Sequence, residues 1–200
     1  MSRKTTWLLI PIVTTVIAIG LFASFLANRS VSSDSKRSSS SDALTLIAGY
    51  KDWAKVNPQP VLMETRTAIL CTAPTLTRGQ DVNGQTNPHH RKYITVYVNE
   101  AGRKAMTEQS KPQFPEGSVI VKEKLSSPSS KTPELLTVMI KRENGFNPEN
   151  GDWEFMVVDG GATKIEQGKL ESCQTCHQAM PKTDFIFRSY LPNDIANKLK

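Results

Sequence analysis

Residues 173–177 read Cys173-Gln174-Thr175-Cys176-His177, a C-x-x-C-H sequence close to the carboxyl end of a 200-residue chain. Two thiols at this spacing can each form a thioether with one vinyl group of the same porphyrin, and the adjacent histidine then lies under the iron. The motif predicts one covalent haem c, with Cys173 and Cys176 as attachment points and His177 as the proximal ligand. The fold must therefore enclose a large planar group.

A C-x-x-C pair has two other common uses. A thioredoxin-like redox pair opens a helix early in a βαβ unit, and no such pattern precedes Cys173. A structural zinc site needs four ligands, and only three of them are local here. Haem attachment is the stronger interpretation.

The amino-terminal segment predicts a membrane anchor. Arg3 and Lys4 precede residues 7–27, which contain no charged side chain and are long enough to cross a bilayer as a helix. The run ends without a small-x-small cleavage site, so we expect residues 1–28 to be an uncleaved inner-membrane anchor, with a cleaved signal as the alternative. The positive charges favour a cytoplasmic N-terminus, which leaves the rest of the chain in the periplasm, where haem c is attached.

The remaining chain divides into a linker and one domain. Residues 29–42 are a serine-rich, flexible tether, and residues 43–200 suit one globular domain large enough to shield a haem. The net charge of +6 is shared equally between residues 1–42 and the domain. No cluster of basic residues is interleaved with aromatic ones, which excludes nucleic-acid binding. The third cysteine, Cys71, ends an apolar run and is interpreted as a small buried residue.

The domain is predicted to be α+β, with four or five antiparallel strands and a few helices. The helical spacing of Leu46, Tyr50 and Trp53 predicts a helix over residues 43–56. Alternating or β-branched residues predict strands over residues 62–70, 93–98, 118–125, 135–141 and 153–158. Other helices are predicted over residues 100–109, 170–180 and 194–200, with residues 185–190 extended or looped.

The sixth coordination position of the iron is predicted to be open or weakly held. Only 23 residues follow His177, and Met180, their one methionine, is too close to it to reach the opposite face of the haem. An open position binds small molecules, whereas a six-coordinate haem mainly passes electrons. His89 or His90 could instead supply a sixth ligand, although both are more simply read as exposed loop residues. The aromatic residues that could form the haem pocket are Phe146, Trp153, Phe155, Phe185 and Phe187.

Several segments, in their order and spacing over about residues 48–192, resemble the cytochrome P-460 family. They are Tyr93–Val98, Pro115–Glu123, Gly151–Phe155, Cys173–His177 and Thr183–Phe187. The resemblance implies a mainly antiparallel β fold, a single haem c and a homodimer. In hydroxylamine-oxidising members a lysine, here Lys122, is joined covalently to the porphyrin edge. A related group, cytochrome c-prime-beta, lacks the crosslink and binds nitric oxide or carbon monoxide.

Two residues qualify what the resemblance implies. Strand alternation alone would make Lys122 a solvent-facing lysine on one face with Ile120 and Lys124. Hydroxylamine-oxidising members also carry a carboxylate over the open side of the haem, but the matching position falls near Thr137, and the nearest acid is Glu134. A missing base would slow an oxidation that releases protons without preventing a diatomic gas from binding.

The sequence therefore predicts a cytochrome that binds or oxidises a small nitrogen species, with Lys122 and Glu134 as candidate catalytic residues. Its alternatives are a nitric oxide-binding or sensing protein without turnover and a simple electron-transfer cytochrome. A redox partner protein is expected for oxidation or electron transfer, which must pass electrons on.

Overall fold

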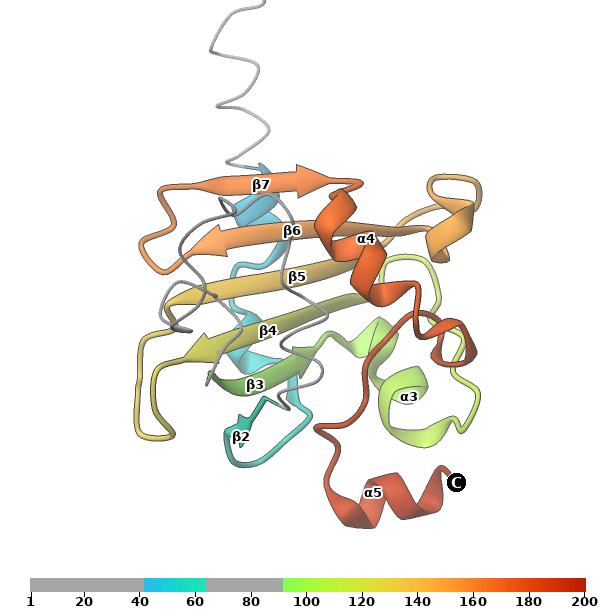
Figure 1. The fold of residues 1–200 in the computed structure, drawn as a ribbon, viewed down its shortest axis with the longest axis horizontal. Coiled ribbons are helices and arrows are strands. Elements are labelled where there is room, and N and C mark those ends of the chain that lie inside the picture. The colour runs from blue at the N-terminus through green and yellow to red at the C-terminus, as the bar shows by residue number, and fades with distance from the viewer. Residues whose placement is uncertain (1–41, 64–91) are drawn as a thin grey trace, which may run out of the picture.

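The protein is built on an antiparallel sheet with helices packed across one of its faces (Figure 1). The computed structural model describes residues 42–63 and 92–200, and in this part of the chain the sheet has seven strands in the order β1-β3-β4-β5-β6-β7, with β2 also paired to β3. The strands are β1 (Ala54–Lys55), β2 (Val61–Leu62), β3 (Tyr93–Val98), β4 (Val119–Leu125), β5 (Leu135–Lys141), β6 (Trp153–Asp159) and β7 (Ile165–Gly168). Every pairing among them is antiparallel. The predicted α+β class is confirmed.

The central strands are buried on both faces of the sheet, so their side chains divide into two cores. One core includes Val96, Ile120, Met139 and Phe155, and it packs against the helices α3 (Glu100–Glu108), α4 (Glu171–His177) and α5 (Asn193–Lys198). We call this side of the sheet the α4 face. The opposite face carries Val119, Val121, Val138, Ile140, Met156 and Val158. It is covered by the chain that precedes β1, which passes behind the sheet in Figure 1.

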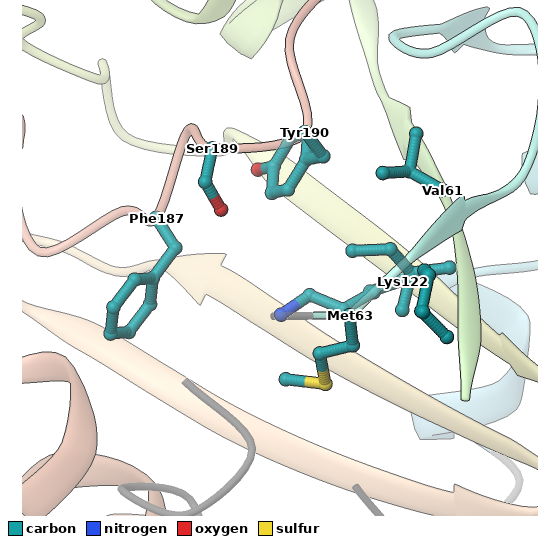
Figure 2. Close-up of a pocket in the computed structure, with 8 residues that line it drawn as sticks. Val61, Met63, Lys122, Phe187, Ser189 and Tyr190 are labelled. Atoms are coloured by element: carbon teal, nitrogen blue, oxygen red, sulfur yellow. The ribbon is translucent and has the colours of Figure 1, made fainter. Parts of the chain in front are cut away.

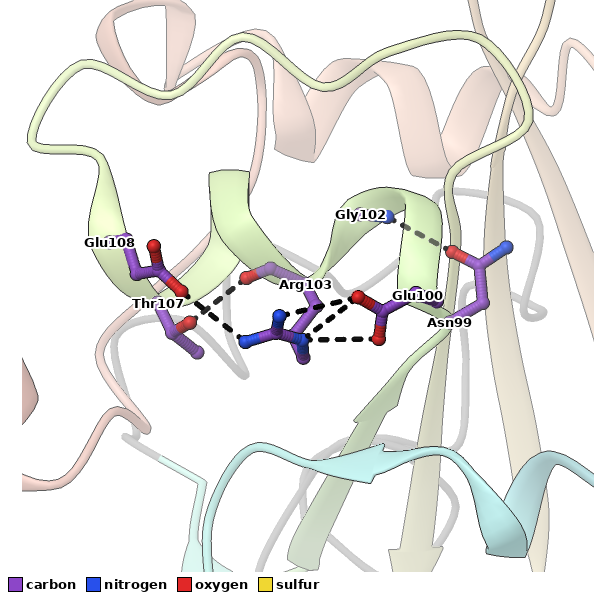
Figure 3. A network of polar contacts seen from close by, with 6 residues as sticks. All are labelled: Asn99, Glu100, Gly102, Arg103, Thr107 and Glu108. Atoms are coloured by element: carbon purple, nitrogen blue, oxygen red, sulfur yellow. Dashed lines mark hydrogen bonds and ion pairs between the residues drawn. The ribbon is translucent and has the colours of Figure 1, made fainter.

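Helix α3 is fixed to the sheet by Asn99. The Asn99 side-chain oxygen accepts hydrogen bonds from the backbone N–H groups of Gly102, at 3.2 Å, and Val119, at 3.0 Å, so one residue caps α3 and holds it to β4. Figure 3 shows this cap beside the exposed contacts of Arg103 with Glu100 and Glu108. Such exposed ion pairs contribute little to stability. The orientation of α3 therefore depends mainly on Asn99 and on burial.

The helix predicted over residues 43–56 is wrong beyond its first turn. The chain is helical over residues 42–46, turns at Gly49 with a φ of 72°, and forms a short 3-10 helix, Tyr50–Asp52. Ala54 and Lys55 then pair with β3 as strand β1. Gly49 readily adopts a left-handed conformation that ends a helix, and pairing with the free edge of β3 satisfies the backbone that follows.

Most of the other predicted elements are confirmed, with ends that differ by at most three residues. Strands β3 to β6 and helices α3, α4 and α5 all lie within predicted elements or within a residue of them, and the loop after α4 contains residues 185–190 as expected. The predicted number of strands is too low because β1, β2 and β7 are very short. Strand β7 reads Ile-Glu-Gln-Gly and has almost no apolar signal.

Some predictions fall on parts of the chain that the structure does not describe. The strand predicted over residues 62–70 is described only to residue 63, and the membrane anchor, Cys71, His89 and His90 lie outside the described residues. Within residues 42–63 and 92–200, no helix has the length and apolar character needed to span a bilayer.

Candidate functional site

Helix α4 gathers the three residues of the C-x-x-C-H motif against the α4 face of the sheet. Cys173 and Cys176 are three residues apart, and Cys173 and His177 are four apart, so all three side chains project from neighbouring positions of one short helix. Cys176 is buried in the core of the α4 face, and Cys173 is partly buried and packs against the same core. Both thiols and the imidazole thus face the same apolar region.

Gln174, one of the two residues between the cysteines, fixes α4 to the rest of the domain. The side-chain oxygen of Gln174 accepts hydrogen bonds from the amides of Asn147 and Asn150, both at 2.9 Å. Its side-chain nitrogen donates to the Lys169 carbonyl at 3.1 Å. Asn147 in turn donates to the carbonyl of Trp153 at 2.9 Å. Gln174 therefore connects the helix that carries the cysteines to the start of β6.

His177 has its ring orientation and its tautomer set by a backbone carbonyl. Its Nδ1 lies 2.6 Å from the carbonyl oxygen of Phe185. A carbonyl oxygen only accepts hydrogen bonds, so Nδ1 carries the proton and Nε2 keeps its lone pair. This is the arrangement found in histidines that bind a metal through Nε2 and donate from Nδ1 to a second group. The donor set therefore fits a haem iron.

The environment of His177 keeps its imidazole neutral. Burial lowers the pKa of His177 to about 4, and the positive charges of Lys122 and Lys124 act in the same direction. The hydrogen bond to the Phe185 carbonyl opposes these effects and is outweighed. A neutral imidazole is the form that can bind iron.

The structure distinguishes among the aromatic residues proposed for the pocket. Phe155 and Phe187 flank the His177 ring, with centroids 5.4 Å and 5.1 Å away. Phe185 contributes its carbonyl to His177, and Trp153 lies deeper, in edge contact with Phe114 at 5.4 Å. Phe146 instead lies beneath the Lys169 ammonium, 5.0 Å from the centroid of its ring.

Lys122 lies on the α4 face, with its side chain partly buried. In the sheet register it pairs with Val96 of β3 and with Thr137 of β5, so these three residues share one face. Lys122 lines a small open hollow that is also lined by Phe187, the residue in contact with the His177 ring. Figure 2 shows the Lys122 side chain reaching into this hollow. Lys122 is therefore not the solvent-facing strand lysine that alternation alone suggests.

The two candidate proton-transfer positions lie in different places. Thr137 is directly opposite Lys122 in the sheet. Glu134 lies just before β5 and forms a close ion pair with Lys92. It precedes Met139, the residue opposite Phe155, by five positions, which is roughly 17 Å in an extended chain. Glu134 is thus far from His177 and already has a cationic partner.

The described residues do not support a thioredoxin-like redox pair or a structural zinc site at Cys173 and Cys176. Helix α4 follows β7, an antiparallel strand, rather than the parallel strand of a βαβ unit. Over residues 42–63 and 92–200, no group of three or more His, Cys, Asp or Glu side chains is arranged to hold a metal ion.

Sequence reasoning missed the parts of the site that carry no motif. These are the Phe185 carbonyl, the amide cluster around Gln174, and Lys124, which is fully buried on the same face as Lys122. Lys124 alone had a usable signal, because strand alternation already places it beside Lys122. A backbone carbonyl and an amide between two cysteines leave no pattern that a single sequence reveals.

Two thiols and a neutral histidine on one short helix, held over an aromatic sheet face, define a c-type cytochrome domain. The Cytochrome P460 family model matches residues 47–188 of this chain, and the chain belongs to the cytochrome P460 family. The family predicted from the sequence segments is thus confirmed, and the cofactor is a covalently attached haem c. None of the curated proteins matches the sequence.

Replacing Gln174 with Ala is expected to loosen α4 without preventing haem attachment. The variant leaves the buried amides of Asn147 and Asn150 without their shared acceptor, which we expect to lower the free energy of unfolding by about 1–3 kcal/mol. Chemical denaturation of the haem-loaded protein measures this. Gln178→Ala, on the exposed side just after α4, is the matched control and should stay near wild type. Equal stability of the two variants would contradict the role given to Gln174.

Proposed function

We propose that this chain is a membrane-tethered monohaem cytochrome whose domain faces the periplasm and binds or oxidises a small nitrogen species, hydroxylamine or nitric oxide. The observation that carries the proposal is that Lys122 and His177 lie on one sheet face, joined by Phe187. Membership of the cytochrome P460 family supports the same conclusion. We further propose a homodimer and a redox partner protein.

Each residue of the site has a distinct task in this proposal. Cys173 and Cys176 hold the porphyrin through thioethers, and His177 binds the iron through Nε2. When bound, the haem supplies the redox and ligand-binding chemistry, and the protein supplies orientation and electrostatics. Lys122 is the candidate for a covalent bond to the porphyrin edge. The hollow around it is lined mainly by apolar side chains, including Met63.

Proton transfer is the weakest part of an oxidase mechanism here. Oxidising hydroxylamine releases several protons, and a positioned base typically contributes 10²–10⁴-fold to such a step. Thr137, opposite Lys122, has only a hydroxyl group. Glu134, just before the start of β5, is paired with Lys92. These contacts favour ligand binding or slow turnover over rapid catalysis.

A second candidate, electron transfer, is favoured by one specific contact. Met63 is buried and lines the same hollow as Lys122 and Phe187. A methionine thioether is a common axial ligand in electron-carrier cytochromes. If Met63 bound the iron opposite His177, the sixth position would be closed to small molecules.

The crosslink is tested by replacing Lys122. In the haem-loaded full chain, a proteolytic digest should yield one species in which the peptide containing Lys122 is joined through the porphyrin to the peptide containing Cys173 and Cys176. The ferrous protein should show a broad band far to the red of a normal Soret peak. Lys122→Ala should lose both signatures, whereas Lys104→Ala, on the exposed side of α3, should keep them. An unchanged Lys122→Ala spectrum would remove the crosslink from the proposal.

The state of the sixth position is tested by ligand binding. Ferrous wild-type protein should bind nitric oxide with a clear change in its absorption spectrum, and with hydroxylamine and an artificial electron acceptor it should turn over slowly at most. A sharp six-coordinate spectrum that ignores nitric oxide would instead favour electron transfer. In that case Met63→Leu should open the position, because leucine keeps the volume and removes the sulfur.

The location is tested in cells that mature haem c. The full chain should sediment with membranes, resist alkaline carbonate extraction and be digested by protease added to spheroplasts, as expected for an anchored periplasmic domain. A chain recovered in the soluble periplasmic fraction, with a mass lacking residues 1–28, would indicate a cleaved signal instead.

A further inference from the structure

The turn that contacts His177 is held in an unfavourable backbone conformation. Asp184 and Phe185 both have positive φ angles, 51° and 64°. Left-handed backbone is uncommon for residues other than glycine and is an outlier for a bulky one such as phenylalanine. Such a conformation is strained and persists only where surrounding contacts enforce it. Phe185 is the residue whose carbonyl accepts the hydrogen bond from His177 Nδ1.

The contacts that enforce this turn meet at Asp184. Its carboxylate accepts hydrogen bonds from the Lys141 ammonium, at 2.8 Å and 2.7 Å, and from the backbone N–H of Phe114, at 2.9 Å. Its backbone carbonyl accepts the indole N–H of Trp153 at 2.8 Å. The side chains of Lys141 and Asp184 are only 14% and 8% exposed. The ion pair is therefore largely removed from water, where a charged hydrogen bond is stronger than at the surface.

Close packing leaves the turn little freedom to relax. A Cβ atom added to Gly151 would lie 2.6 Å from the Phe185 ring and 2.8 Å from the Asp184 carboxylate. The Lys141 ammonium also lies over the Trp153 ring, 5.0 Å from its centroid. The turn is thus held on one side by Lys141 and Trp153 and on the other by the backbone of Gly151.

We propose that Asp184, anchored by Lys141, is a positioning residue that holds the Phe185 carbonyl against Nδ1 of His177 and thereby sets the bond between His177 and the haem iron. Its effect reaches the iron only through the Phe185 carbonyl and the imidazole. The inference rests on the proposed role of His177 as the iron ligand.

The direction of the effect follows from the hydrogen bond. A strong acceptor at Nδ1 gives the imidazole more anionic character, which strengthens its bond to iron and stabilises the ferric state. Losing such a supporting contact typically changes metal binding or activity about 10- to 100-fold. A tenfold change in the balance between ferric and ferrous states corresponds to about 59 mV for one electron.

Asp184→Asn and Lys141→Met provide the main test, in the haem-loaded full chain. Asparagine tolerates a positive φ and keeps an acceptor for Phe114, so Asp184→Asn should still fold while losing the charged contact with Lys141 that anchors the turn. Both variants should lower the frequency of the iron–histidine stretching vibration in the ferrous protein. The reduction potential of Asp184→Asn should rise, by about 59 mV for a tenfold effect.

The paired variants separate positioning from a simple charge effect. Asp184→Asn removes a negative charge and Lys141→Met a positive one, so a purely Coulombic influence would move the potential in opposite directions and leave the stretching frequency unchanged. That result would overturn the proposal, as would a wild-type frequency in whichever of the two variants folds. Lys141→Arg keeps the ion pair with Asp184 and should therefore retain the wild-type frequency, in contrast to Lys141→Met.

Two further variants complete the test. Asp152→Asn is the matched control, because Asp152 also has a positive φ, of 58°, and accepts a backbone hydrogen bond, from Asn147 at 2.8 Å. It should leave the iron–histidine vibration unchanged. His177→Ala should abolish the vibration. If the vibration survived in His177→Ala, the ligand assignment itself would be wrong. A vibration lost in His177→Ala but unchanged in Asp184→Asn would sink only the role of Asp184.

Discussion

The hydrogen bond between Nδ1 of His177 and the Phe185 carbonyl is the interaction on which the site depends. It selects the tautomer that leaves Nε2 able to bind iron, and it fixes the plane of the ring between Phe155 and Phe187. To make this hydrogen bond, the short loop after α4 must reverse direction so that its Phe185 carbonyl lies next to His177. The left-handed conformations of Asp184 and Phe185 make that reversal, and the buried contacts of Asp184 offset its cost.

The sheet register supplies the second constraint, because it determines what shares a face with His177. Lys122 lies on this face beside Val96 and Ile120, with Lys124 next to it. Burying lysine side chains on such a face is unfavourable unless another group interacts with them. Their positive charges also keep His177 neutral. The register thus places two cationic side chains on the sheet face that holds His177.

The parts of the fold that could be predicted from the sequence are those with a local physical signal. Alternating apolar residues located β3 to β6, and the C-x-x-C-H motif located α4. Strand β7 was missed because its few polar residues pair only with the edge of β6. The helix over residues 43–56 was overextended because its periodicity continues past Gly49, where the backbone turns. The Phe185 carbonyl and the Lys141–Asp184 pair join segments distant in sequence, and nothing in their local sequence indicates that they meet.

The pairing of β4 with β5 determines which residues lie close enough to Lys122 to act with it in proton transfer. Thr137 faces the same side as Lys122 and is its direct cross-strand neighbour, so an acid at that position would lie beside the lysine. Glu134 is three residues before Thr137, and residues an odd number of positions apart on a strand point to opposite faces. Glu134 also lies before the first residue of β5. Its carboxylate also forms an ion pair with Lys92. Proximity in sequence therefore does not make Glu134 a substitute for an acid at position 137.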